Sequence, residues 1–400
     1  MKLTDAHRLR LLYALVFSCT ASWLPIFADY LRDRGLSGIQ TGIVLSVTPV
    51  MMLLVQPFYG ALADRIGYRR CLAASALLAA LSYAGYLSEG GFAFLMLLTV
   101  AMSLFYNTLQ PLLDTLALRW VQAHPEESYG TMRLAGAAGW ALTGITVGQY
   151  IDALSTEVIF LFAGGSMVLT ALVAGFLAAD RSLEAQPADA SWAYLREALG
   201  SRELLFLLGC VFLVSAGATT IWNFYSLYLK ENGASASLVG FGLSFQGLCE
   251  LPLFYLSARI IRRLGIKRTL LLTIAATTLR LVLYGVVKDP RAAIAIELLH
   301  GVSWSLFWVV CVEYVNSLIP EAWRATGQSL LYAAYFGAGA IAGNLWTGWL
   351  YDAQLKLALI FLLNAGIVGA TGLAVWIWMR PRPEGEDAPL RPWGHSEDLA

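Results

Sequence analysis

Hydrophobic residues in this chain are gathered into long segments. Apolar stretches of roughly 20 residues alternate with short polar or charged clusters from end to end, and a helix needs about 20 such residues to cross a bilayer. The pattern therefore predicts an all-α membrane protein. Twelve transmembrane helices are expected, over residues 9–30, 38–60, 71–88, 92–118, 130–151, 157–179, 203–229, 236–258, 268–287, 292–318, 326–350 and 356–379.

The second half of the chain repeats the first at an offset of 198 residues. The segment 30–37 (YLRDRGLS) returns as 228–235 (YLKENGAS), and later glycines stay in register. A duplicated unit in so apolar a chain predicts two pseudo-symmetric six-helix bundles with a site between them. We expect the bundles at 1–180 and 203–380, a cytoplasmic linker at 181–202 and a disordered cytoplasmic tail at 381–400.

Composition narrows the class of protein further. Only 14% of the residues are charged and 58% are hydrophobic, and 27 basic residues balance 27 acidic ones, so no basic surface for nucleic acid is expected. The five cysteines fall inside predicted spans and act as small apolar residues, so we expect no disulfide, metal or cofactor. Lysine and arginine are concentrated in segments on the side of the N-terminus, which places both termini in the cytoplasm.

The loop after the second predicted span carries a recognisable motif. It reads GALADRIGYRR over residues 60–70, and it resembles the signature loop of the major facilitator superfamily. The resemblance implies a secondary transporter fold in which this loop is a conformational latch on the inner side. The residues that match the motif are Gly60, Asp64, Arg65, Gly67, Arg69 and Arg70.

A closer resemblance covers the fourth and fifth predicted spans. PLLDTLA at 111–117, followed by YGTMRLAG at 129–136, is similar to the phenylpropionate-permease group and, more distantly, to the lactose permease. The spacing from Arg280 to His300 also resembles the latter, where such a pair belongs to the proton-coupling network. Ser303 and Phe336 depart from that pattern, so its coupling mechanism does not carry over intact.

Five ionisable residues inside predicted spans have no charged counterpart 198 residues away. A charge at the centre of a spanning helix costs about 2.5 to 3.5 kcal/mol by insertion scales, so it needs a partner or a wet cavity. One hypothesis is proton coupling by the four in the second half, and the alternative is a static ion pair of the arginine with either glutamate. The five are Arg133 in the first half and Glu250, Arg280, Glu297 and His300 in the second.

Arg133 is the candidate for holding a substrate, and its alternative role is to pair with Asp114 alone. Trp140 lies two turns after Arg133 on the same predicted helix. It either stacks on a sugar ring, as the resemblance to the lactose permease implies, or only packs against neighbouring helices. The other predicted cavity-lining residues, which packing alone would equally explain, are Tyr106, Asn107, Trp222, Asn223 and Trp304.

Together these patterns favour a secondary active transporter, and not an enzyme. We expect alternating-access symport of protons with a small organic solute, namely an aromatic carboxylate, a sugar or a nucleoside. Its partners would be the solute, protons and the lipid bilayer, and it would act as a monomer in a bacterial inner (plasma) membrane. The alternatives are proton-antiport efflux of drugs or metabolites and, from another class, a polytopic membrane enzyme or a transport-dead sensor.

Overall fold

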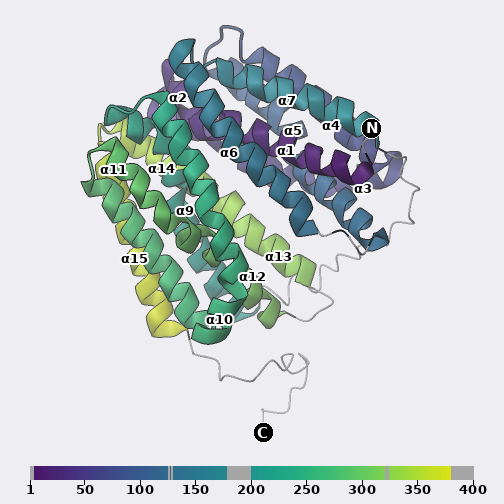
Figure 1. Cartoon of the computed structure of the whole chain (residues 1–400). Coiled ribbons are helices and arrows are strands. Elements are labelled where there is room, and N and C mark those ends of the chain that lie inside the picture. The colour runs from purple at the N-terminus through teal and green to yellow at the C-terminus, as the bar shows by residue number, and fades with distance from the viewer. Residues whose placement is uncertain (1–3, 125–126, 128, 178–199, 320–323, 380–400) are drawn as a thin grey trace.

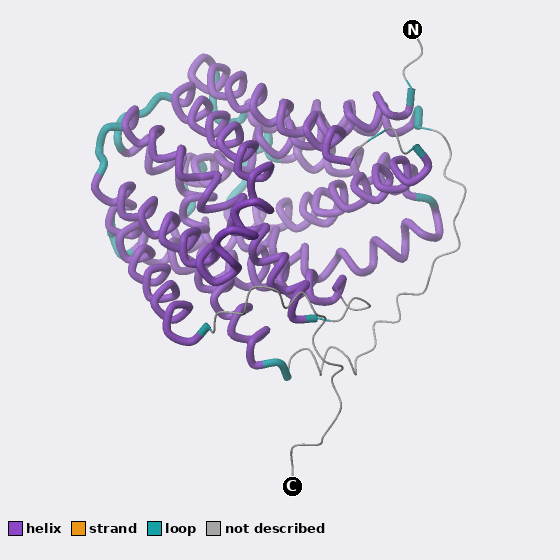
Figure 2. Tube along the Cα trace, turned by 60° about the horizontal axis from the view of Figure 1, so that its bottom comes forward, coloured by secondary structure: helices purple, strands orange, loops and turns teal. Residues whose placement is uncertain are grey.

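The computed structural model describes residues 4–124, 127, 129–177, 200–319 and 324–379. Within these ranges every regular element is a helix (Figures 1 and 2). The expected tail at 381–400 and nearly all of the expected linker at 181–202 lie outside the described residues.

The helices of the first half follow the predicted spans closely. The first span is an α-helix, a short 3-10 turn and a second α-helix, and the others are continuous. Their bounds are α1 (Asp5–Trp23), η1 (Leu24–Ile26), α2 (Phe27–Asp33), α3 (Gly38–Ile66), α4 (Tyr68–Gly85), α5 (Phe92–Ala123), α6 (Tyr129–Ala153) and α7 (Val158–Gly175).

The second half is less regular. Helix α10 runs through two predicted spans and has a non-helical residue, Gly265, between them. Two later spans each contain a π-helical segment, η3 and η5. The bounds are α9 (Arg202–Glu231), α10 (Ala236–Val286), α11 (Pro290–Ala295), η2 (Ile296–Leu299), η3 (Gly301–Leu306), α12 (Phe307–Leu318), α13 (Arg324–Tyr332), η5 (Ala333–Gly339), α14 (Ala340–Asp352) and α15 (Leu357–Trp378).

The repeated positions lie where helices end and begin. Gly35 and Gly233 follow α2 and α9 with φ of 79° and 86°, a left-handed conformation that glycine adopts without strain and that closes a helix. The serine two residues later, Ser37 or Ser235, starts the next helix by accepting a hydrogen bond from a backbone N–H of its first turn. The duplicated segment thus encodes the same helix-turn-helix connection twice.

The helices pack as two groups that meet along two seams. Helices α1 to α7 pack against one another, as do α9 to α15, and the main contacts between the groups are α3 with α14 and α6 with α10. Figure 1 shows the first group in purple to blue and the second in green to yellow. Both seams lie at one end of the molecule, beside the connections that follow α2, α6, α9 and α14.

Glycines bring the two groups into backbone contact at these seams. A Cβ atom built on Gly240 of α10 would lie 2.2 Å from the carbonyl oxygen of Gly144 on α6, and one on Gly348 of α14 would lie 2.3 Å from that of Gly38 on α3. No side chain fits at such distances. We call this end of the molecule, with the connections around residues 35, 154, 233 and 354, the closed end.

One aspartate on each seam caps a helix of the other group. Asp152 accepts hydrogen bonds of 2.8 Å from the amides of Ala236 and Ser237 at the start of α10, and a further one from the Ser237 hydroxyl. Asp352 accepts hydrogen bonds from the first two amides of α3, with a distance of 2.8 Å to the amide of Ile39. Both carboxylates therefore stabilise the positive end of a helix across the seam.

The two capping aspartates lie just outside the predicted spans 130–151 and 326–350. Partial burial raises the pKa of each carboxyl, but hydrogen bonds outweigh it. Those from Ser237 and Ala236 lower the pKa of Asp152, and those from Ile39 and Gly38 lower the pKa of Asp352 below the ordinary value. Both groups are therefore charged at neutral pH.

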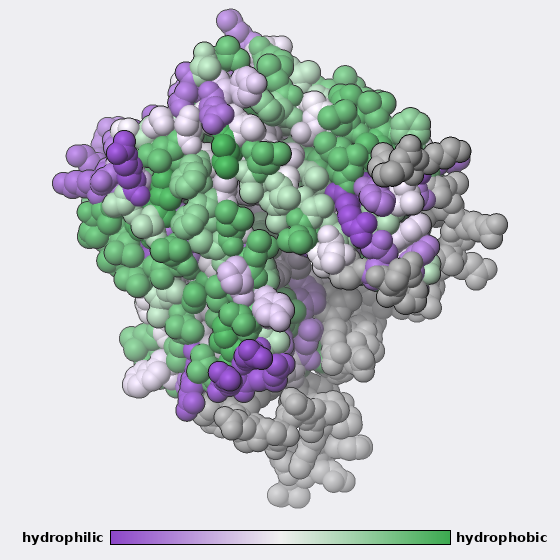
Figure 3. Space-filling view, in the orientation of Figure 1, coloured by the Kyte–Doolittle hydropathy of each residue, from purple (hydrophilic) through white to green (hydrophobic). Residues whose placement is uncertain are grey.

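The outer surface is largely hydrophobic. Figure 3 shows apolar side chains over most of the visible face and a recess between the two halves beside the grey segments. Eight helices in the described part of the chain are long and apolar enough to cross a membrane, with α10 covering two predicted spans; α4, α6 and α13 to α14 are not among them. The number of spans therefore stays a prediction.

Candidate functional site

A connected polar network occupies the interior of the second half. Arg280 and Glu297 form a salt bridge, and both side chains are almost fully buried, 3% and 0% exposed. The hydroxyl of Tyr284 donates a hydrogen bond to the other oxygen of Glu297, and a second nitrogen of Arg280 lies 2.7 Å from His300 Nδ1. The carboxylate and guanidinium thus neutralise one another in a site that excludes water.

The position of the proton on His300 follows from its neighbours. Nδ1 faces two nitrogen donors, Arg280 Nη1 at 2.7 Å and Gln246 Nε2 at 3.1 Å, so Nδ1 must accept. The proton then lies on Nε2, which donates to Glu250 Oε1 at 2.8 Å. His300 is therefore a neutral imidazole that connects the buried Arg280 to Glu250.

Glu250 is the end of this network that is open to solvent. Its side chain is 25% exposed, whereas His300 is fully buried. The helix that carries the central members is irregular: Glu297 lies in the 3-10 segment η2, and the π-helical segment η3 begins directly after His300. Such irregular turns are frequent at functional sites because they redirect side chains within one helix.

A second polar cluster lies in the first half. Asp114 of α5 accepts hydrogen bonds from the hydroxyls of Tyr13 at 2.6 Å and Tyr129 at 3.0 Å. Arg133 donates to the Tyr129 hydroxyl at 2.8 Å, lies 3.8 Å from Asp114 Oδ2 and sits over the ring of Phe17. The Arg133 side chain is still 44% exposed, so most of its five donors are free to meet a bound solute.

The two clusters lie on opposite halves beside the same seam. Trp140 of α6 donates to the carbonyl of Leu243 on α10, and Arg133 and Glu250 each lie seven residues, about two turns, further from the closed end on these helices. The exposed cation of one half and the partly exposed carboxylate of the other therefore lie at a similar depth between the halves.

Three of the other predicted cavity-lining residues make hydrogen bonds that hold helices together. Trp140 Nε1 donates to the carbonyl of Leu243 at 3.3 Å, so it packs across the α6–α10 seam. Tyr106 donates to the hydroxyl of Thr20, and the amide of Asn107 donates to a backbone carbonyl of α3. These contacts account for the burial of the three side chains without a ligand.

The aromatic residues of the second half surround the polar network. Trp222 lies edge-on to His300 and Trp304, with ring centroids 5.4 and 5.1 Å away. Trp304 in turn contacts Tyr335 and Phe336. The aromatic cluster shields His300 from water on this side.

The predicted latch lies at the end of the molecule opposite the closed end. Gly67 connects α3 to α4 with a φ of 93°, and Arg69 donates to the carbonyl of Leu177 at 2.7 Å. Arg65 and Arg70 are exposed. Gly60 and Asp64 lie in α3, but the Asp64 side chain is outside the described part of the structure, so the role of both residues stays a prediction.

Three members of these clusters were missed from the sequence although helix spacing points to them. Gln246 lies four residues before Glu250, Tyr129 four before Arg133, and Tyr284 four after Arg280. Side chains four apart share one face of a helix. Searching for polar residues one turn from each buried charge would have found them.

Comparison with known proteins agrees with this architecture. The model of the MFS_1 like family matches residues 6–363. The chain is 29% identical over 383 residues to the maltose permease of Geobacillus stearothermophilus, covering 94% of this chain and 95% of the permease. It is 26% identical to the "Probable 3-phenylpropionic acid transporter" of Escherichia coli (strain K12), covering 88% and 93%.

A solved structure shows the same fold. A single-residue mutant of the nucleoside transporter NupG superposes with a TM-score of 0.86 at 17% identity, covering 94% of this chain and 100% of NupG. The family match over residues 6–363 and the permease relatives confirm the family resemblance inferred from the loop motif. The chain belongs to the MFS_1 like family and is a multi-pass membrane transporter of the major facilitator superfamily.

Proposed function

We propose that this transporter couples the movement of protons to the uptake of a small organic solute by alternating access. In this proposal twelve spans form two bundles, residues 1–180 and 203–380, with both termini in the cytoplasm of a bacterial cell. The protein acts as a monomer in the inner membrane, as a transporter and not as an enzyme. The conformation described above is then closed to the outside and open to the cytoplasm.

The observation that carries the proposal is the chain from Arg280 through His300 to Glu250. A neutral histidine that donates to a partly exposed carboxylate supports Glu250 as the residue that binds and releases the proton. Glu297 and Tyr284 hold Arg280 in place, so this arginine keeps His300 neutral. A proton on Glu250 removes the negative charge that lies at the depth of Arg133 on the other half, which makes the charge state sensitive to how the halves are placed.

Arg133 is the proposed substrate contact, with Asp114 orienting it. An arginine with free donors beside a carboxylate suits an anionic or hydroxyl-rich solute. The names of the relatives include a sugar permease and a phenylpropionic acid transporter, and the structural neighbour is a nucleoside transporter. The proposed substrate classes are therefore sugars, aromatic carboxylates and nucleosides.

Uptake into proteoliposomes tests the coupling. Radiolabelled maltose, 3-phenylpropionate and uridine are offered with and without an imposed inward proton gradient. We expect at least one to accumulate only with the gradient, and Glu250→Gln to lose this dependence because the side chain no longer titrates. Glu89→Gln, an exposed loop variant, serves as the control. Accumulation that is indifferent to the gradient in the wild-type protein would remove the symport claim.

Binding of the same solute tests Arg133. We expect Arg133→Gln to weaken binding at least tenfold while thermal unfolding stays near that of the wild type, because the side chain is half exposed and not a core residue. Arg291→Gln, at an exposed position in the first turn of α11, is the matched control. Unchanged affinity in Arg133→Gln would make this arginine a partner of Asp114 only.

A further inference from the structure

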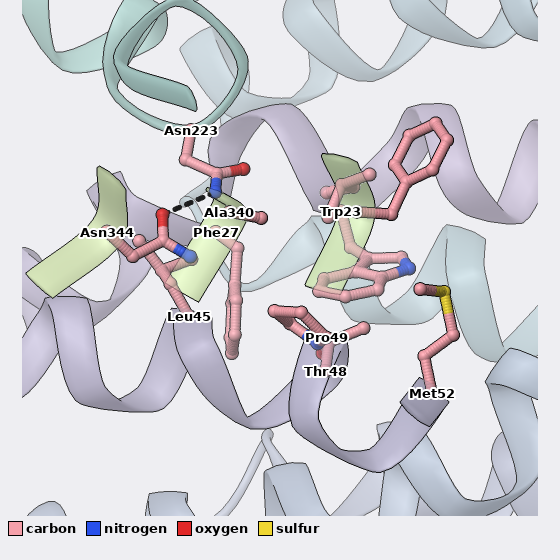
Figure 4. A pocket seen from close by; sticks show the side chains of 11 residues that line it. Trp23, Phe27, Leu45, Thr48, Pro49, Met52, Asn223, Ala340 and Asn344 are labelled. Carbon is pink, nitrogen blue, oxygen red and sulfur yellow. Dashed lines mark hydrogen bonds between the residues drawn. The ribbon is translucent and has the colours of Figure 1, made fainter. Parts of the chain in front are cut away.

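A small cavity lies between the two halves, and none of its described lining residues belongs to the Arg133 or Glu250 cluster. One wall comes from the first half, with Trp23, Phe27 and Met52, and the other from the second half, with Asn223 and Asn344. Figure 4 shows the two asparagines joined on one side and Trp23 with Met52 on the other. The cavity therefore lies at the interface between the two halves and not inside either half.

Its size and lining select the kind of molecule that fits. The cavity has a volume of about 150 Å³, and an apolar cavity of about this size holds one benzene-sized ring. Aromatic side chains of Trp23, Phe27 and Phe336 offer faces and edges for such a ring. No charged residue is among the described residues that line it, so an ionised ligand would lose its hydration without a counter-charge.

One buried donor in the wall has no partner. Asn344 is fully buried; its Oδ1 accepts a 2.7 Å hydrogen bond from Asn223 Nδ2. Its own Nδ2, like the indole nitrogen of Trp23, is buried without a hydrogen-bond partner in the described structure. Buried donors are nearly always satisfied, so an orphan in a cavity wall indicates a missing acceptor.

The cavity also depends on the conformation. Asn344 meets the other half directly, because a Cβ atom on Gly42 would lie 2.5 Å from its backbone carbonyl oxygen. The cavity begins one helical turn further from the closed end, between Leu45 of α3 and Ala340 of α14. Separating α3 from α14 at the closed end would split its two walls apart. A molecule that needs both walls can bind only while that end is closed.

We propose that this cavity is a ligand site for an uncharged, benzene-sized ring that carries a carbonyl or hydroxyl acceptor. The ring lies among the aromatic side chains and its acceptor meets the free amide N–H of Asn344. Occupancy holds the closed end shut. The site contains Asn223, one of the predicted cavity-lining residues, but neither Arg133 and Asp114 nor the network from Arg280 to Glu250, and it does not depend on the direction or coupling of transport.

Benzamide is the probe, because it has the ring and the acceptor and no charge. Binding to the purified full-length protein is measured by titration calorimetry. Three comparison compounds each lack one property: acetamide lacks the ring, toluene lacks the acceptor, and benzoate is charged. We expect saturable one-site binding of benzamide and at least tenfold weaker binding of the other three. Equal binding of benzoate or acetamide would overturn the proposal.

Two variants test the place of binding. Asn344→Leu keeps the side-chain volume and removes the N–H donor, so it should weaken the binding of benzamide at least tenfold and leave the binding of toluene unchanged. Ala340→Leu fills the cavity and should remove the binding of both. Asn316→Leu, outside the cavity, makes the same chemical change as a control. Wild-type affinity for benzamide in both cavity variants, each checked by thermal unfolding, would refute the site.

The conformational consequence is measured separately. Spin labels at Glu89→Cys and Lys288→Cys report the distance between the halves at the closed end, since these exposed positions lie on connections of different halves. Saturating benzamide should shift the distance distribution toward its short component. A shift toward longer distances would refute the link between this site and the closed end. An unchanged distribution in a protein that populates both the short and the long distances would also refute it.

Discussion

Replacing both capping aspartates with asparagine is expected to open the closed end. Asp152 and Asp352 are the only residues described here that cap a helix of the opposite half, and each does so with a charged carboxylate. Asparagine has nearly the same shape but only one acceptor oxygen and no charge. The change therefore removes the charge and one of the two acceptor oxygens from each cap, with little change in packing.

The size of the effect follows from the number of bonds lost. Losing a negative charge at a helix N-terminus costs about 0.3 to 1 kcal/mol and losing one hydrogen bond costs about 0.5 to 1.5 kcal/mol, so each asparagine variant should lose about 1 kcal/mol. Because the open conformation has no bond to lose at the seam, that energy is lost from the closed conformation alone. About 1 kcal/mol changes the ratio of the two conformations roughly 5-fold, and the two caps on separate seams should add to roughly 30-fold.

The assay is the distance between spin labels at Glu89→Cys and Lys288→Cys in the otherwise unchanged protein. We expect each single asparagine variant to increase the long-distance component and the double variant to make it dominant. The matched control is Asp289→Asn, since Asp289 also caps a helix, α11, but within its own half. That control should leave the distances as in the wild type.

One result would refute this reasoning. If the double asparagine variant has the same distance distribution as the wild type, the capping bonds do not hold the closed end. The glycine contacts of the two seams would then be sufficient to keep the halves together.

Two further predictions concern buried charge and pH. Arg280→Met should lower the free energy of unfolding by about 3 to 5 kcal/mol because it leaves Glu297 charged and buried, and a second change, Glu297→Leu, should recover most of the loss; chemical denaturation measures both. Hydrogen bonds hold the pKa values of Asp152 and Asp352 below the ordinary aspartate value of about 3.9, so they stabilise the closed end above that pH. That contribution should be lost as the pH falls through the lowered pKa values, and spin-label distances should lengthen on acidification below about pH 4 more in the wild type than in the double asparagine variant, which keeps the ion pair of Asp29 with Lys230 between the halves.

Much of the fold was predictable because its signals are local. Segments of apolar residues marked the helices, and the repeated glycine and serine marked the connections that end one helix and begin the next. Such features depend only on residues a few positions apart. The grouping of Arg280 with His300 was also within reach, since equal depth on adjacent spans brings the two side chains together, and they lie 2.7 Å apart.

The exact partners of the charges were not predictable in the same way. The sequence left Arg280 to pair with either Glu250 or Glu297, and the structure assigns it to Glu297 while His300 bridges to Glu250. Which of two carboxylates faces an arginine depends on helix rotation and on the irregular turns around His300. A difference of one residue in helix phase rotates a side chain by about 100°.

The sequence by itself determined the class of the protein, its helices and its duplication. The lengths of the apolar segments, the turn residues and the repeat are all properties of the residue order and need no knowledge of tertiary contacts. Only the tertiary structure decided where the halves touch. The caps at Asp152 and Asp352, and the cavity that joins Trp23 to Asn344, bring together residues 84 to more than 300 positions apart. Such contacts exist only in one placement of two packed bodies, and no local pattern of residues specifies that placement.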